Sequence, residues 1–244
     1  MKVENFMKPL PRAYMKNDVL NIDSFLDFSD FQNNVKTILE KSVELPLIQR
    51  LVIAGSTITD FSFLKLFPSL KQLSFLACNS EKWFELNGTT NVISLRLHNL
   101  KQGKFYLPSI AFVRTFPKLE YLYSAMLGID NFSELQGLNH IHTVFVVGRN
   151  ENDIKKPFDY SALEFLPEFN VFNTWMAVDR HRIPAESIIP VLRNSSVTSV
   201  TVTQLYATER KKLNLLISKI NPGLLRSTLS NEELHKINLS SFAW

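Results

Sequence analysis

The sequence predicts an α/β solenoid, in which short strands lie side by side in one curved parallel sheet. Two observations predict this fold: a proline element that occurs four times, and an apolar pattern that occurs seven times at steps of 22 to 28 residues. Hydrophobic residues make up 45% of the 244-residue chain and charged residues 20%, as in an ordinary folded protein. Self-similarity at a fixed period of roughly 20–50 residues indicates stacked repeats.

The proline element consists of a large apolar residue, a proline and a short stretch that ends in Leu or Phe. Its prolines are Pro46, Pro68, Pro117 and Pro167. The first two prolines are 22 residues apart, and the two later gaps are 49 and 50 residues long. Each later gap therefore has room for one further copy without a proline.

The apolar pattern marks one strand in each repeat. It reads apolar, two variable residues, apolar, one variable residue, and then an apolar or small residue. The copies begin at Ile48, Leu70, Val92, Leu119, Ile141, Phe169 and Val197. Because alternate residues of a strand face opposite sides, we expect the last two pattern positions, such as Leu51 and Ile53, to point into a shared core. Copies of 22 residues favour tight return turns, and those of 27 and 28 residues have room for helical ones, such as residues 184–192.

At these residues the chain resembles the leucine-rich repeat family. Residues 70–78 (LKQLSFLAC) are similar to the family's strand-and-turn consensus, with Cys78 at the position of its Asn or Cys ladder residue. Residues 58–61 and 129–132 are similar to the segment that follows it. The nearest variant is the bacterial internalin-like repeat of 22 residues. The resemblance implies a leucine-rich repeat solenoid of about seven repeats, with helical N- and C-terminal caps.

The resemblance weakens toward the C-terminal end, as the ladder position shows. In chain order this position is Ser56, Cys78, Leu100, Leu127, Arg149, Ala177 and Leu205. Only the first two copies supply a polar group, so the sequence does not show how the later turns satisfy their backbone. Cys78 is expected to be a buried structural thiol, since a nucleophile would need a positioned base.

A solenoid needs caps because stacking leaves its core open at both ends. We divide one structural domain into residues 1–44 (an N-terminal segment and helical cap), residues 45–205 (the repeats) and residues 206–244 (a C-terminal helical cap). In the first part, Ser29 and Asp30 predict the start of a helix over residues 31–39. Residues 1–20 are expected to be loosely ordered.

The C-terminal cap is predicted to begin with a helix over residues 207–220. Asn221, Pro222 and Gly223 end this helix. A second short helix is expected near residues 230–233. The last residues are expected to fold back over the final repeat.

No catalytic or metal motif is complete in this sequence. It contains no phosphate loop, no Gly-x-Ser-x-Gly elbow and no His-Glu-x-x-His, so we expect a protein that is not an enzyme and has no cofactor. His140 and His142 project to one side of a strand as zinc ligands can, but no nearby Cys or carboxylate completes the set. An enzyme or metal-binding protein that uses a groove with His98, His140 and His142 is the alternative hypothesis.

Charge and composition limit the partners. Residues 1–178 carry 18 Lys and Arg against 18 Asp and Glu, whereas residues 179–244 carry 9 against 5. This surplus is small, so a nucleic-acid partner is not expected. No apolar run is long enough to span a membrane. The single cysteine and the absence of an apolar leader core near the start suggest a cytoplasmic protein.

The outward positions of the strands are the candidate site. They include an aromatic patch, which we expect to be exposed, and a basic strip beside it, residue types that dominate binding hot spots. The candidate partner-binding residues are Arg50, Lys71, Arg96, His98, Tyr121, Tyr123, His142, Phe145, Trp175 and Met176. We predict a non-catalytic module that binds another protein through its concave face. A more specific hypothesis is that the module is an intracellular inhibitor, such as an immunity protein that neutralises a bacterial toxin. No motif in the sequence points to this role in particular.

Overall fold

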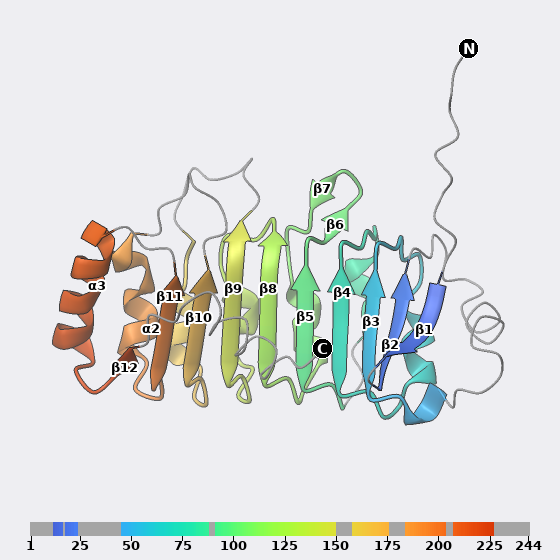
Figure 1. Ribbon diagram of the computed structural model, residues 1–244, viewed down its shortest axis with the longest axis horizontal. Coiled ribbons are helices and arrows are strands. Elements are labelled where there is room, and N and C mark those ends of the chain that lie inside the picture. Colours follow the sequence, from blue (N-terminus) through green and yellow to red (C-terminus); the bar gives the residue numbers. More distant parts are fainter. Residues whose placement is uncertain are drawn as a thin grey trace, which may run out of the picture.

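A computed structural model describes residues 12–16, 18–23, 45–87, 91–149, 158–175, 184–203 and 207–226. Ten of its strands form one curved sheet in which every strand lies beside its neighbours in chain order (Figure 1). In sheet order these are β1 (Arg12–Lys16), β2 (Val19–Asp23), β3 (Arg50–Ala54), β4 (Gln72–Leu76), β5 (Ser94–His98), β8 (Tyr121–Leu127), β9 (Thr143–Arg149), β10 (Val171–Trp175), β11 (Ser199–Thr203) and β12 (Leu225–Arg226).

The seven strands β3 to β11 are the seven predicted repeats, and all of them are parallel. They pair in the predicted register, so that Leu51 lies beside Leu73 and Leu73 beside Leu95. The two inward positions of each strand are buried in one continuous core, which confirms the predicted solenoid. Two inward positions are polar, Ser124 and Thr174, and both are buried as well.

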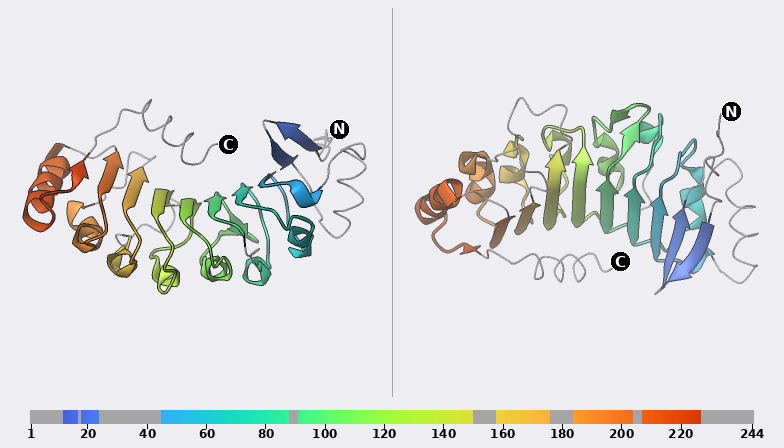
Figure 2. Two further views of the ribbon diagram at one scale, coloured as in Figure 1. Left: turned by 90° about the horizontal axis from the view of Figure 1, so that it is seen from below. Right: turned by 45° about the horizontal axis from the view of Figure 1, so that its top comes forward.

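The return segments lie on the convex side of the sheet (Figure 2). Most are single 3-10 turns, and the predicted helical return over residues 184–192 is confirmed. They are η1 (Leu45–Leu47), η2 (Ser62–Leu66), η3 (Trp83–Glu85), η4 (Ala111–Thr115), η5 (Ser133–Leu135), η7 (Ser161–Phe165), and η8 (Ala185–Ile188) with α2 (Ile189–Arg193). The 27-residue copy returns through the short 3-10 helix η4. Its additional residues form a hairpin of β6 (Lys101–Gln102) and β7 (Phe105–Tyr106) beyond the end of β5.

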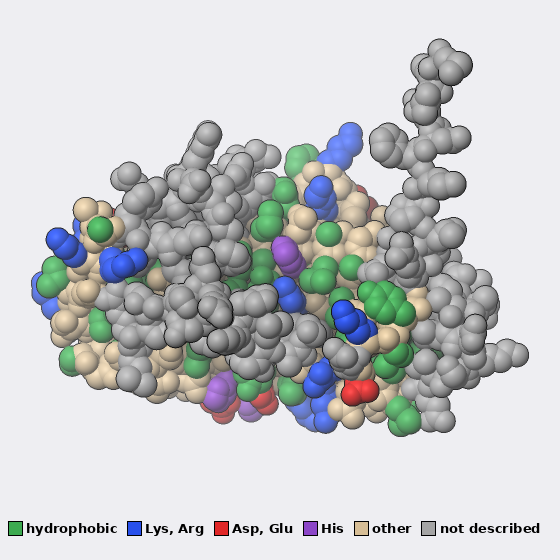
Figure 3. Space-filling model, viewed as in Figure 1, with side chains coloured by type: hydrophobic (Ala, Val, Ile, Leu, Met, Phe, Trp, Pro, Cys, Tyr) green, Lys and Arg blue, Asp and Glu red, His purple; other side chains and the backbone are tan. Residues whose placement is uncertain are grey.

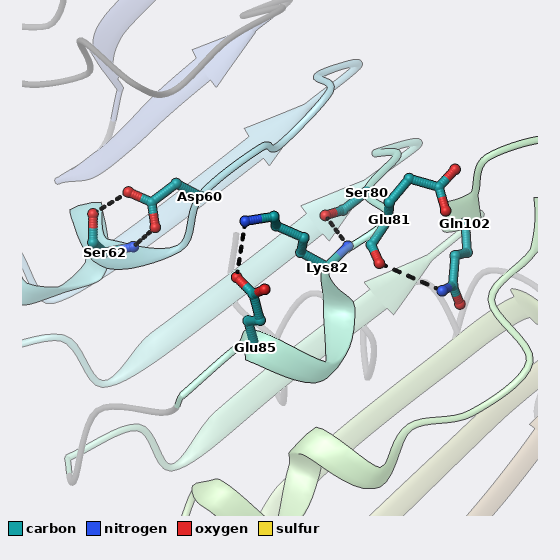
Figure 4. Close-up of polar contacts among 7 residues, drawn as sticks. All are labelled: Asp60, Ser62, Ser80, Glu81, Lys82, Glu85 and Gln102. Atoms are coloured by element: carbon teal, nitrogen blue, oxygen red, sulfur yellow. Dashed lines mark hydrogen bonds and ion pairs between the residues drawn. The ribbon is translucent and has the colours of Figure 1, made fainter.

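A polar side chain begins five of the described 3-10 turns, η2 to η5 and η7, by accepting a hydrogen bond from the backbone two residues later. The Ser62 N–H donates to Asp60 Oδ1 at 2.9 Å, and the Lys82 N–H donates to Ser80 Oγ at 3.0 Å (Figure 4). The same bond begins η4, η5 and η7, from Ala111 to Ser109, Ser133 to Asn131 and Ser161 to Asp159. A bond of the same kind, from Ser196 to Asn194, lies in the turn after α2. Because these short side chains satisfy otherwise unpaired donors, they fix where these five return segments begin.

The strand ends explain how the solenoid turns without a polar ladder in every copy. The residue after β3, β4 and β5 and the equivalent residue of β8 have positive φ: Gly55, Ala77, Asn99 and Met126. In the first two copies Ser56 Oγ donates to Ala54 O at 2.9 Å and Cys78 Sγ to Ile53 O at 3.3 Å. In the next two, Leu100 and Leu127 are buried in the core. Backbone bonds link neighbouring copies, as when the Lys101 N–H donates to Cys78 O at 2.9 Å.

The N-terminal end differs from the prediction. Residues 12–16 and 19–23 form the antiparallel hairpin β1–β2, and β2 continues the parallel sheet beside β3. The expectation of loose order over residues 1–20 is therefore wrong for this stretch. Asp18, at φ 63°, lies in the two-residue turn, and Leu20 and Ile22 extend the core. The predicted helix over residues 31–39 lies outside the described residues.

At the other end, α3 (Ala207–Ile220) confirms the predicted helix and its end before Asn221. Leu213 and Ile217 are its buried residues. After it, β12 pairs in parallel with β11, a strand that the sequence did not predict. The expected short helix near residues 230–233 and the last residues lie outside the described part of the chain.

Candidate functional site

The concave face of the sheet is formed by the outward residues of the strands, and the parallel register arranges them in three rows. The lower row, at the start of the strands, contains Arg50, Gln72, Ser94 and Tyr121, and the middle row contains Val52, Ser74, Arg96, Tyr123 and Phe145. The upper row contains Ala54, Leu76, His98, Ala125 and Val147. Figure 3 shows that hydrophobic and positively charged side chains lie next to one another over β3 to β5.

A second hydrophobic cluster, separate from the main core, lies on this face over β8 and β9. The concave cluster comprises Tyr123, Ala125, Phe145 and Val147, with Tyr121 packed against it. The Tyr123 and Phe145 rings are stacked, with centroids 4.9 Å apart and planes inclined by 10°. Strands in register lie about 4.8 Å apart, which places the two rings at stacking distance.

Two members of the aromatic patch, Tyr123 and Phe145, are not exposed, which corrects the prediction for them. Tyr123 is 7% exposed and Phe145 is 1% exposed, whereas Tyr121 is half-buried. The alternation of the strands correctly predicts that these side chains leave the main core. It does not predict their burial, because burial on this side depends on what else packs against it.

The other two members of the predicted patch are Trp175 and Met176. Trp175 is the last residue of β10, and its backbone lies beside Val147. Met176 lies outside the described residues.

The predicted basic strip is divided between two levels of the sheet. Arg50 opens β3 and Lys71 precedes β4, both at the lower edge, whereas Arg96 lies in the middle row. The Arg96 guanidinium carbon lies 4.6 Å from the centroid of the Tyr123 ring, a cation–π contact. Arg96 therefore belongs with the concave cluster rather than with the other two cations.

Polar atoms without partners lie beside the concave cluster, and sequence reasoning missed them. Within the described structure, four concave atoms of β4 and β5 are buried without a hydrogen-bond partner: Gln72 Oε1, Ser74 Oγ, Ser94 Oγ and Arg96 Nε. We call these residues the concave polar set. Their signal in the sequence was the placement of Gln, Ser and Arg at outward positions of two consecutive strands.

The three histidines are not brought together. His98 lies level with Val147 of β9, five residues beyond His142, a separation of about 16 Å along the strand. His140 Nδ1 lies 3.3 Å from Glu168 Oε2 on the exposed lower edge. Burial and the nearby Arg96 charge lower the pKa of His98. Among the described residues no group of three His, Cys, Asp or Glu could hold a metal ion.

Cys78 is buried, as predicted. Desolvation raises the pKa of its thiol to about 11, and its sulfur contacts the backbone oxygens of Ile53 and Leu76. A thiol with this pKa carries almost no thiolate near neutral pH, so it is a structural group.

In the described part of the chain no helix is long and apolar enough to span a membrane.

Seven parallel strands in chain order, with the described return segments on the convex side, decide the fold. The chain has the fold of a leucine-rich repeat solenoid. No protein-family model matches its sequence, and no curated protein matches it either.

Two solved structures of Listeria monocytogenes internalins are similar to this solenoid. Internalin C2 is 15% identical, with a TM-score of 0.48 and coverage of 80% of each chain. The internalin inlF is 14% identical, with a TM-score of 0.45 and coverage of 74% of this chain. The match spans about half of the inlF chain, 54% of its length.

Proposed function

We propose that this solenoid is a non-catalytic module that binds another protein through its concave face. The observation that carries the proposal is the pairing of the concave cluster with the concave polar set on the face opposite the return segments. An apolar centre bordered by hydrogen-bonding groups is the usual anatomy of a protein interface.

The polar set supports a protein partner in particular. A buried donor or acceptor without a partner costs about 1–3 kcal/mol, so a ligand that pairs with several such groups gains affinity. Gln72 Oε1 is an acceptor, Arg96 Nε a donor, and the hydroxyl groups of Ser74 and Ser94 can be either. A polypeptide backbone offers both kinds of group at close spacing and could pair with this mixed set.

The size of the face limits how tightly such a partner binds. Seven strands about five residues long cover roughly 450 Å², whereas a standard interface needs about 800 Å² on each partner. The β6–β7 hairpin can supply more area, because it extends beyond β5 and holds Phe105 78% exposed. We therefore include this hairpin in the interface.

An inhibitor fits this surface, because it acts by covering its partner and needs no chemistry of its own. Within the proposed function, the more specific role that we propose is that of an intracellular inhibitor, such as an immunity protein that neutralises a bacterial toxin. Its support is that the concave cluster and the concave polar set lie together on one face of the described solenoid.

The test is affinity capture from the source cells with a panel of immobilised baits. Arg96→Ala and Gln72→Ala change the concave face, and Phe84→Ala is the matched control because Phe84 lies on the convex side in η3 and is 75% exposed. We expect the native chain and Phe84→Ala to capture the same protein and the two concave variants to retain at least tenfold less. Equal capture by all four baits, or loss with Phe84→Ala alone, would contradict the proposal.

A further inference from the structure

Arg96 is a cation of the concave face without a counter-charge. None of the ion pairs in the described part of the chain involves Arg96, and its Nε–H has no hydrogen-bond acceptor. Along the described strands β3 to β11, the outward residues include Arg50, Arg96 and His98 but no Asp or Glu. The charge of Arg96 also lowers the pKa of His98, as a positive field at this point of the face would. This part of the face therefore favours an anion.

Three further members of the concave polar set lie beside Arg96, so that the charge is part of a larger group. Ser74 is its register neighbour on β4, about 4.8 Å away at the backbone, and Ser94 lies two residues earlier on β5, about 7 Å away. Gln72 is in turn the register neighbour of Ser94. Ser74 and Ser94 are 1% and 2% exposed, and neither hydroxyl has a hydrogen-bond partner. Three groups that can donate a hydrogen bond thus lie side by side.

An aromatic contact holds the guanidinium of Arg96 in place and leaves a donor available. The guanidinium carbon lies 4.6 Å from the centroid of the Tyr123 ring, and that ring stacks in turn on Phe145. Because the ring accepts the cation through its π-face, the contact does not use up the Nε–H of Arg96, which has no partner. A side chain that is already held in place loses little freedom when it binds a ligand.

We propose that Arg96, Ser74 and Ser94 form an anion site that receives an Asp or Glu side chain of the partner protein. This inference rests on the proposed function, since it names the group that the partner presents to the concave face. A carboxylate only accepts hydrogen bonds, and it can take one from Arg96 and one from each hydroxyl. Gln72 Oε1 is an acceptor and is left for a backbone N–H of the same partner segment. An acidic segment of a protein supplies both groups.

A single carboxylate fits this face better than the phosphates of a nucleic acid. Arg50 and Arg96 are the two permanently charged outward residues of the described strands β3 to β11. They lie two strands apart and in different rows. A nucleic acid requires a denser stripe of cations, because every phosphate carries a charge. One guanidinium with two hydroxyls beside it matches one negative charge.

The test follows the Arg96 Nε–H by two-dimensional NMR of the isotope-labelled full chain while sodium acetate is added at constant ionic strength. Acetate is the probe because it carries the carboxylate alone. We expect the Arg96 signal, which is assigned by its loss in Arg96→Lys, to shift along a saturating curve. The Arg114 Nε–H is the internal control and should not follow that curve, because it already donates to Glu134 O at 2.8 Å.

Ser74→Ala and Ser94→Ala each remove one donor and keep the cation. Each should weaken acetate binding roughly fivefold, as the loss of one hydrogen bond predicts. Ser218→Ala is the matched control, because Ser218 is exposed on α3, and it should leave the affinity unchanged. The dispersion of the amide signals shows whether each variant is folded. Should Ser74→Ala fail to fold, Ser94→Ala carries the comparison.

Three outcomes would overturn the proposal. A linear drift of the Arg96 signal, equal to that of Arg114, would mean that the site binds no carboxylate. Unchanged affinity in the serine variants would mean that Arg96 acts as an isolated charge. Inorganic phosphate that binds at least tenfold more tightly than acetate would mean that the site takes a phosphate. No partner is present, so failure here and failure of the capture experiment are told apart.

Discussion

His98 shows how a single residue depends on its neighbours in the sheet. It lies in the upper row at the end of β5, half-buried, with Arg96 two residues before it on the same strand. Both burial and the positive charge of Arg96 disfavour the imidazolium, which is why the pKa of His98 is lowered. Neither cause can be read from the sequence position alone, because each depends on how deeply the concave face is covered.

This shift predicts a pH dependence of stability. Because the folded-state pKa of His98 is lowered, the unfolded chain takes up the proton first as the pH falls through about 6.5. The free energy of unfolding should therefore decrease between about pH 7 and the lowered pKa. Urea denaturation at several pH values checks this, and His98→Gln should have a flatter profile. A native chain and a variant with identical slopes would contradict the assignment.

Some secondary-structure elements could be predicted from the sequence and others could not. The strands were predictable because each needs only two inward apolar positions at a fixed step. Helix α3 was predictable because a helix stop follows Ile220. The hairpins β1–β2 and β6–β7 lie outside the repeat period, so periodicity gave no signal for them. The polar residue that opens five of the return turns varies among Asp, Asn and Ser and lies at unequal steps, which hid its repetition.

Removing one of these turn bonds should have a measurable cost. In Asn131→Ala the Ser133 N–H loses its acceptor at 2.9 Å, and we expect the free energy of unfolding to fall by about 1 kcal/mol. Gln136→Ala is the matched control, because Gln136 is exposed at the other end of the same turn. Chemical denaturation compares the two. Equal stabilities would mean that the side-chain bond does not hold the turn.

At the scale of the whole molecule, the sequence predicts a stacked solenoid with two faces, and the structure confirms it. The candidate site was predicted only in part. Alternation placed Arg96, Tyr121, Tyr123 and Phe145 on the concave face, but it could not show that two of the aromatic side chains are buried. Nor could it show which polar atoms lack partners, since both properties depend on segments distant in sequence.

The central claim is that a partner binds the concave face, and hydroxyl-radical footprinting of the chain with and without its captured partner tests it most directly. The account predicts that the partner protects His98 and Tyr121, both half-buried on that face, and leaves oxidation of the exposed convex residues Phe84 and Phe165 unchanged. Protection of Phe84 and Phe165 with no change at His98 and Tyr121 would place the partner on the convex side and contradict it.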